Sequence, residues 1–412
     1  MSADELKEKD KEKRGFSFTK LALFLFMVIF IAGVSMYAFM GINPIDLFAD
    51  GISGFRNRVF TASSEQLSEN IKKIASYDSS AKISCIDVSG DLAVADISSV
   101  RIYDSDGREK AYVPVNLKKP YIQAYQKEIL IADLNGRYVS LISDGRLLWE
   151  KTLDEDLVNA SLSENWILLI TESSQSGYKR AIRAYSKDGQ EIAFRNVSNY
   201  YPFDVFHFPK FNQALFVVNG IEASSIEANG FFEFLDPKMN QKASIRGQKE
   251  VFARGIPLEK ERLFLYGEKS LIVIDSAINT VWSKEFTDST LTAAGVIKGK
   301  FPVLAELNTE VLSRESRYET TIRILNADFT QKAQLIIDDK VTSICTMGET
   351  TAVQAGSEVY FINTSGEIMD RYTSKSDIKG VYLAAKDLAY IVSAGTIDRV
   401  QIQVTHKFLG IF

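Results

Sequence analysis

One short pattern recurs seven times between residues 100 and 373: a strand of alternating residues, a polar turn and a second strand. Successive turns begin 37 to 51 residues apart, at Asp104, Ser143, Ser186, Asp236, Asp275, Asn326 and Asn363. A period of about 40–45 residues that contains several short strands is typical of a β-propeller blade. We therefore predict an all-β fold in which each copy belongs to one four-stranded blade.

The two ends of the repeated region indicate how many blades there are. The first copy extends back to residue 83, and Ser-Gly and Asp-Gly turns, which are strong hairpin signals, divide it into strands at 83–88, 91–96, 99–104 and 109–115. An eighth, incomplete copy follows Asn363, with Thr405 at its turn position. The sequence thus favours eight blades over seven. Since the last copy is too short for a fourth strand, a segment near the first blade or the tail 406–412 must complete it.

A segment of 20 uncharged residues, 21–40, precedes the repeats. As a helix it would span about 30 Å, the thickness of a bilayer core. Six basic residues lie before it, and the first ones after it are Arg56 and Arg58, so the N-terminus is predicted to be cytoplasmic and the rest external. The segment is longer than the apolar region of a cleaved signal peptide, and no Ala-x-Ala site follows it. We predict an uncleaved signal anchor.

These features divide the chain into a charged cytoplasmic tail, a transmembrane anchor, a juxtamembrane helical linker and an extracytoplasmic propeller, at 1–19, 20–41, 42–80 and 81–412. Apolar residues at helical spacing in 43–60 fit either an amphipathic helix on the outer leaflet or an ordinary linker. A second apolar stripe contains Leu67, Ile71 and Ile74.

Three long insertions separate the second and third strands of their blades, at 171–180, 221–230 and 306–319. In an antiparallel meander these connections leave on one face, opposite the tight Asp-Gly turns. Insertions in a repeat protein usually mark the binding side, although tolerated loop drift would look the same. Tyr and Arg are enriched at binding hot spots. The candidate partner-binding residues are therefore Tyr178, Lys179, Arg180, Glu222, Glu227, Arg314, Arg317 and Tyr318.

No residue pattern predicts a catalytic, metal or cofactor site. His207 and His406 are the only histidines, and no Gly-x-Ser-x-Gly motif occurs. The segment 104–107 resembles part of a calcium loop, but a turn explains it fully. A net charge of −5 gives no electrostatic footprint for nucleic acid. We expect neither an enzyme nor a nucleic-acid-binding protein.

Two further features fit more than one interpretation. Cys85 and Cys345 occupy comparable positions of two repeats, and an external location permits a disulfide between them, although two core thiols would fit as well. The aromatic cluster 200–211 fits the buried start of a blade or an exposed hot spot.

Two copies, SDGRLLWEKTL (143–153) and IDSAINTVWSKEF (274–286), resemble the propeller repeats of quinoprotein dehydrogenases and, more broadly, WD40-like repeats. In that family a Trp after the turn docks one blade on the next, and Trp149 and Trp282 stand at this position. Similar repeats occur in non-enzymatic envelope propellers, such as the lipoprotein that assists outer-membrane protein assembly. A membrane anchor followed by degenerate repeats also resembles an uncharacterised family of Gram-positive anaerobes. The resemblance implies the fold; no constellation of residues supports carrying over quinone chemistry.

We therefore expect a membrane-tethered extracytoplasmic propeller that binds a protein or a cell-envelope polymer without catalysis or a cofactor. One alternative is a cell-surface enzyme, either quinoprotein-like or acting on polysaccharides. Another is a single-pass sensor, which would need a partner because the cytoplasmic tail has no room for a signalling domain.

Overall fold

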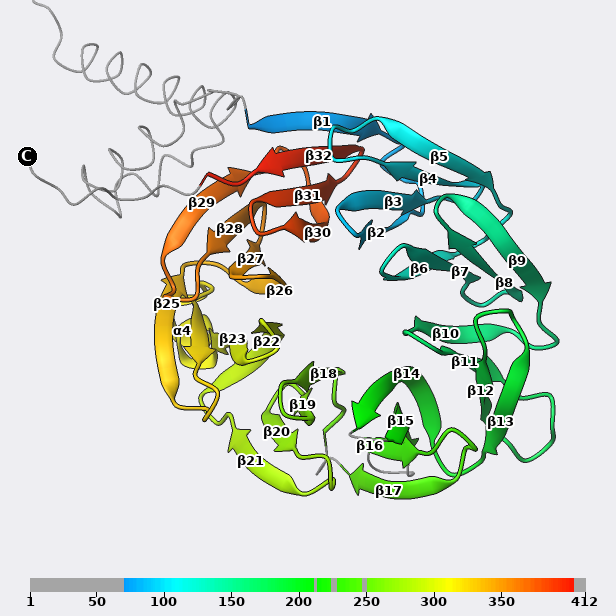
Figure 1. Cartoon of the computed structure of the whole chain (residues 1–412). Coiled ribbons are helices and arrows are strands. Elements are labelled where there is room, and N and C mark those ends of the chain that lie inside the picture. The colour runs from blue at the N-terminus through cyan, green and yellow to red at the C-terminus, as the bar shows by residue number, and fades with distance from the viewer. Residues whose placement is uncertain (1–69, 211–212, 224–227, 247–249, 404–412) are drawn as a thin grey trace, which may run out of the picture. The chain divides into compact units, whose positions relative to one another are not determined.

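A computed structural model describes residues 70–210, 213–223, 228–246 and 250–403. Within these ranges the strands form eight sheets of four antiparallel strands each. The sheets stand around a ring as the blades of a propeller (Figure 1). The prediction of eight blades rather than seven is confirmed.

Seven blades are built from consecutive strands, numbered outward from the centre of the ring. They are blade one, β2 (Ser84–Val88), β3 (Asp91–Ala95), β4 (Ser99–Tyr103) and β5 (Glu109–Pro114); blade two, β6 (Pro120–Tyr125), β7 (Glu128–Asp133), β8 (Tyr138–Ser143) and β9 (Arg146–Thr152); blade three, β10 (Leu157–Leu162), β11 (Ile167–Glu172), β12 (Arg180–Tyr185) and β13 (Glu191–Val197); blade four, β14 (Tyr201–Lys210), β15 (Gln213–Ala223), β16 (Ala228–Leu235) and β17 (Gln241–Arg246); blade five, β18 (Arg254–Leu258), β19 (Arg262–Tyr266), β20 (Ser270–Ile274) and β21 (Thr280–Glu285); blade six, β22 (Ser289–Ile297), β23 (Phe301–Asn308), β24 (Thr320–Leu325) and β25 (Gln331–Ile337); and blade seven, β26 (Val341–Met347), β27 (Thr350–Ala355), β28 (Glu358–Ile362) and β29 (Ile368–Thr373).

The eighth blade joins the two ends of the propeller. Its inner strands are β30 (Ile378–Ala385), β31 (Leu388–Ser393) and β32 (Thr396–Gln401), and its outer strand is β1 (Ile71–Ser76). β1 pairs antiparallel with β32, with Ile71 opposite Val400. The prediction that the chain ends close the ring is confirmed, and the segment before the first blade provides the strand.

This closure corrects one expectation. Ile71 and Ile74, which were placed on a helical stripe of the linker, lie in a strand, so the propeller begins before residue 81. A bulge between Lys73 and Ala75 interrupts the two-residue alternation and explains the three-residue spacing of the two isoleucines. Without β1, the outer edge of β32 would be unpaired.

The core lies between neighbouring blades rather than inside one of them. The second strand of blade two, β7, is buried along nearly its whole length, whereas its outer strand β9 is exposed at most positions. One hydrophobic cluster joins blades one and two, and another joins blades two and three. Continuous runs of Val, Ile and Leu in the inner strands are therefore buried on both faces.

Strand direction divides the ring into two faces. In every blade the connections between strands one and two and between strands three and four leave on the same side, which we call the turn face. Connections between strands two and three, and from each blade to the next, leave on the other side, which we call the insertion face. The three insertions lie at β11–β12, β15–β16 and β23–β24, as predicted. The third contains the short helix α4 (Thr309–Glu315).

Tryptophans dock blades at the turn face. The indole N–H of Trp149 donates to the backbone carbonyl of Lys187 in the next blade, at 2.8 Å. Trp282 stacks on Phe329 of the next blade, with 4.9 Å between ring centroids. Both blade-docking roles are confirmed.

The turn interpretation of residues 104–107 is also confirmed. The Asp104 carboxylate accepts the backbone N–H groups of Asp106 and Arg108, at 2.9 and 2.8 Å. In the aromatic cluster, Tyr200 and Phe208 are buried, which confirms the core interpretation for these residues. Cys85 and Cys345 are free thiols.

The predicted anchor 21–40 and the linker up to residue 69 lie outside the described residues. Among the residues that are described, no helix has the length and apolar character needed to cross a membrane.

Candidate functional site

Two cations of the first insertion contact the next blade, and one of them also pairs within its own blade. The Arg180 guanidinium donates to the backbone carbonyl of Pro202 at 2.6 Å and pairs with Glu172 at 3.4 Å. The Lys179 ammonium lies 4.2 Å from the centroid of the Tyr201 ring. Arg180 and Lys179 therefore attach the insertion to blade four, while the Tyr178 side chain, 39% exposed, is presented to solvent.

The second and third insertions also use their charges internally. Glu222 pairs with Arg246 at 3.2 Å, and Glu227 lies outside the described residues. Arg317 contacts Glu315, Glu319 and Asp338, and its hydrogen bond with Glu315 is the main cause that raises its pKa.

The helix α4 orders the third insertion. The Asn308 side chain accepts the backbone N–H groups of Glu310 and Val311, which caps the helix. Arg314 stands 3.9 Å from Glu310 one turn away, a weak exposed pair. Tyr318, 45% exposed, follows the helix and is free of the core. Of the predicted residues, the two tyrosines are therefore the exposed aromatic contacts.

Two pockets occupy the surface between the second and third insertions, around blade five, which has no insertion of its own. One has a volume of about 560 Å³ and includes Arg246, Glu250 and Lys269. The other, of about 360 Å³, includes Glu306, Glu310 and Arg323. Both are lined by the segment 284–287, so they adjoin, and we call the two pockets together the blade-five groove.

A nearly buried carboxylate organises the smaller pocket. Glu306 is 6% exposed, and its two oxygens contact the Lys284 ammonium at 2.8 Å and the Arg323 guanidinium at 2.9 Å. The same pocket is also lined by Glu285, Asp288 and Glu310, so its charges are mixed. Sequence reasoning did not single out these residues for a site, because they lie in or beside ordinary strands. The signal that could have indicated this site was the charge of Glu306 and Arg323, which stand at the start of the third insertion and just after it.

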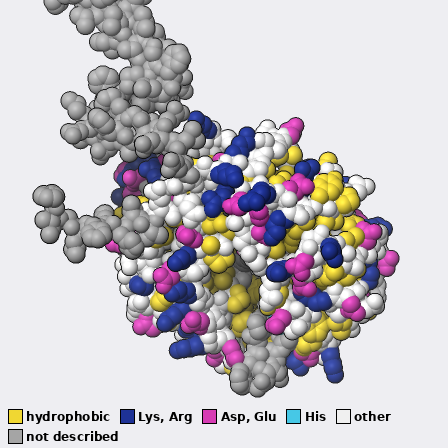
Figure 2. Space-filling model, turned by 45° about the horizontal axis from the view of Figure 1, so that its top comes forward, with side chains coloured by type: hydrophobic (Ala, Val, Ile, Leu, Met, Phe, Trp, Pro, Cys, Tyr) yellow, Lys and Arg dark blue, Asp and Glu magenta, His cyan; other side chains and the backbone are white. Residues whose placement is uncertain are grey.

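Charge is mixed over the rest of the surface. Figure 2 shows Lys and Arg side chains interspersed with Asp and Glu side chains around a hollow where hydrophobic side chains are visible. Within residues 70–403, apart from the gaps in the description, no group of three or more His, Cys, Asp or Glu side chains is placed to hold a metal ion. The groove therefore offers polar and ionic contacts.

His207 lies away from this groove, in the innermost strand of blade four. Burial lowers the pKa of its imidazole, and Nε2 is buried with no hydrogen-bond partner among the described residues. Its ring meets that of Phe216 edge-on, with centroids 6.4 Å apart. Its surroundings are those of a core residue.

The chain belongs to a family of unknown function, DUF5711, whose sequence signature matches residues 61–402. No curated protein matches it. Among solved structures, BamB from Moraxella catarrhalis is 14% identical over 82% of this chain and 99% of its own, with a TM-score of 0.55. Saccharomyces cerevisiae Sqt1 is 9% identical over 80% and 98%, with a TM-score of 0.60. The WD40 domain of SCAP from fission yeast is 9% identical over 81% and 98%, with a TM-score of 0.51. At these identities the likeness shows the fold alone.

Proposed function

We propose that this protein is a non-catalytic binding module that holds a protein or a cell-envelope polymer on its insertion face. The observation that carries the proposal is the blade-five groove, which lies between two insertions on a single face. Exposed Tyr178 in the first insertion and exposed Tyr318 in the third lie on the same face. An elongated polar groove with aromatic residues beside it suits an extended partner better than a small molecule.

The location proposed for this module is outside the cell, tethered by residues 21–40. The support is the Lys/Arg excess before this uncharged segment. Protease added to intact cells should then degrade the propeller and spare residues 1–20. A propeller that stays intact until the cells are lysed would contradict this orientation.

The binding surface can be tested with a photo-crosslinking amino acid at position 178 or 318. We expect both positions to capture the same partner, identified by mass spectrometry. Control probes at Ser105 and Asp144, on the turn face, should not capture it.

Loop variants provide the complementary test. Replacing the loops 173–179 and 309–319, which lie between the strands, with tight turns should abolish capture by a probe at exposed Lys269 in the groove, with no loss of thermal stability. Replacing the Asp-Gly turns at 106–107 and 144–145 with other tight turns should preserve capture. The opposite result would assign the working surface to the turn face.

A further inference from the structure

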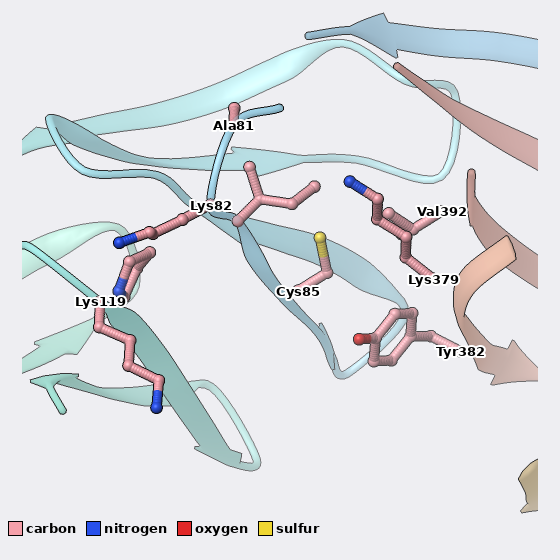
Figure 3. Close-up of a pocket in the computed structure, with 9 residues that line it drawn as sticks. Ala81, Lys82, Cys85, Lys119, Lys379, Tyr382 and Val392 are labelled. Carbon is pink, nitrogen blue, oxygen red and sulfur yellow. The ribbon is translucent and has the colours of Figure 1, made fainter. Parts of the chain in front are cut away.

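A third pocket, of about 480 Å³, opens on the insertion face where the last blade meets the first two. Its walls come from the residues that lead into β2 and β6 and from strands β30 and β31. Figure 3 shows Lys82 and Lys119 on one side of this pocket and Lys379 on the other. Closure of the ring brings these residues together from opposite ends of the propeller. We call this site the lysine pocket.

The lysine pocket carries unbalanced positive charge. No Asp or Glu is among the residues that line it. The exposed side chains of Lys82 and Lys119 form no ion pair within the described part of the chain. The Lys379 ammonium donates one hydrogen bond to the backbone carbonyl of Ser79, at 2.8 Å, and can donate two more.

A carboxylate that contacts the backbone of Lys119 offsets this charge only in part. Asp133 lies beside the rim, where it is buried and accepts the backbone N–H groups of Lys118 and Lys119, at 2.8 and 2.7 Å. Its negative charge is thus held by the backbone at the start of β6. The three lysines around the opening, two on one side and one on the other, outnumber it, and an anion would be attracted.

The floor of the pocket is apolar with one hydroxyl. Ile83, Cys85 and Val392 line it, and burial raises the pKa of the Cys85 thiol to about 12, so the thiol adds no charge. The Tyr382 hydroxyl makes no hydrogen bond with any described residue. Burial also raises the pKa of Tyr382, so this hydroxyl remains a hydrogen-bond donor at neutral pH.

We propose that the lysine pocket binds a small organic phosphate: a dianionic phosphate group lies in the opening, attracted by Lys82 and Lys119 on one side and by Lys379 on the other, and an apolar group lies on the floor. Lysine is a common phosphate ligand, acting as a point charge. The volume lies within the range of about 300–1,000 Å³ usual for small-molecule sites. This site uses blades eight, one and two, so it does not depend on the binding proposed for the blade-five groove.

The test is isothermal titration calorimetry of the full chain with 1-naphthyl phosphate, at low and at physiological salt. We expect saturable binding that weakens as salt rises. Neutral 1-naphthol and inorganic phosphate should each bind at least tenfold more weakly, because each lacks one half of the recognition. Equal binding of 1-naphthol would refute the role of the lysines, and equal binding of inorganic phosphate would refute the role of the floor.

Variants locate the site. Lys82→Gln with Lys119→Gln should weaken binding of 1-naphthyl phosphate at least tenfold. A charge-matched control, Lys127→Gln with Lys386→Gln, removes two exposed lysines from the turn face and should leave binding unchanged. Tyr382→Phe, which keeps the ring, should weaken binding severalfold without lowering the melting temperature. Equal effects of the two lysine pairs, or absence of saturable binding to the parent chain, would overturn the proposal.

Discussion

The turn face keeps one geometry from blade to blade, whereas the insertion face changes in almost every blade. In six blades the third residue after the start of the turn has a positive φ, whether or not it is glycine: Gly107, Gly189, Met239, Ile278, Phe329 and Gly366. A positive φ is unfavourable for residues such as Ile. The geometry is therefore maintained by contacts that outweigh the backbone preference of the residue at this position.

Blade docking explains the constraint. Trp149 reaches the turn of the next blade, where a Cβ atom on Gly189 would lie 3.0 Å from its ring. Trp282 reaches Phe329 in the equivalent turn. A turn of different shape would lose this contact. The second-to-third connections lie on the opposite face, so loops can be added there without disturbing the tryptophan contacts.

The largest effect should follow from removing a strand rather than a loop. Deleting residues 70–76 exposes the edge of β32 and removes Ile71, Ile74 and Ala75 from two core clusters. We expect a loss of about 3–5 kcal/mol, which lowers the melting temperature by roughly 10 °C in a domain of this size. Shortening the loop 309–319 should leave the melting temperature unchanged. Equal effects would mean that the insertions also support the ring.

A docking tryptophan should come next in size. Trp149→Ala removes the ring contact with the next blade and the hydrogen bond to Lys187, at an expected cost of about 3 kcal/mol. Trp149→Phe keeps most of the ring contact and should cost about 1 kcal/mol. Chemical denaturation measures both. If Trp149→Ala leaves the free energy of unfolding unchanged, the turn face is uniform for some other reason.

Two glycines compare the faces directly. Gly189 has a φ of +81° and faces the Trp149 ring, whereas Gly177 in the first insertion has a φ of +86° and open space around it. Alanine at either position should cost about 1 kcal/mol for the backbone conformation. Gly189→Ala should cost about 1 kcal/mol more, because the Trp149 ring must shift. This difference should disappear in a Trp149→Ala background, and additive effects would contradict the docking account.

Most of the fold could be predicted because its turns are local. Asp104, Asp236 and Asp275 each fix a turn through their own neighbours, so their spacing marked the blades. β1 could not be predicted, because six residues with a bulge fit a helix as well as a strand. Which segment would close the ring depended on pairing across the whole chain.

The site was predictable only in outline. Strand direction placed the three insertions on one face, but the sequence did not show that Arg180 is engaged by the next blade and Arg317 by its own loop. Neither the blade-five groove nor the lysine pocket was foreseen. Both depend on residues of different blades, such as Lys82 and Lys379, that become neighbours only when the ring forms.

The smallest expected effect is a change in stability at low pH. Burial raises the pKa of Asp236, but hydrogen bonds from Asn240, Lys242 and Lys238 outweigh it and lower this pKa to about 2. The ordinary value, near 4, applies to the unfolded chain. Because the folded pKa is the lower one, the stabilisation is complete above about pH 4 and is lost as the pH falls towards 2.

Asp236→Asn should therefore be less stable than the parent at pH 6, by less than about 1 kcal/mol for a partly exposed group. The difference between the two chains, measured by urea denaturation, should shrink as the pH falls from 5 towards 2. Asp338→Asn on the insertion face, where the side chain is 83% exposed, is the matched control and should show no such trend. If both variants follow the parent at every pH, the aspartates that open the turns do not stabilise the turn face through their charge.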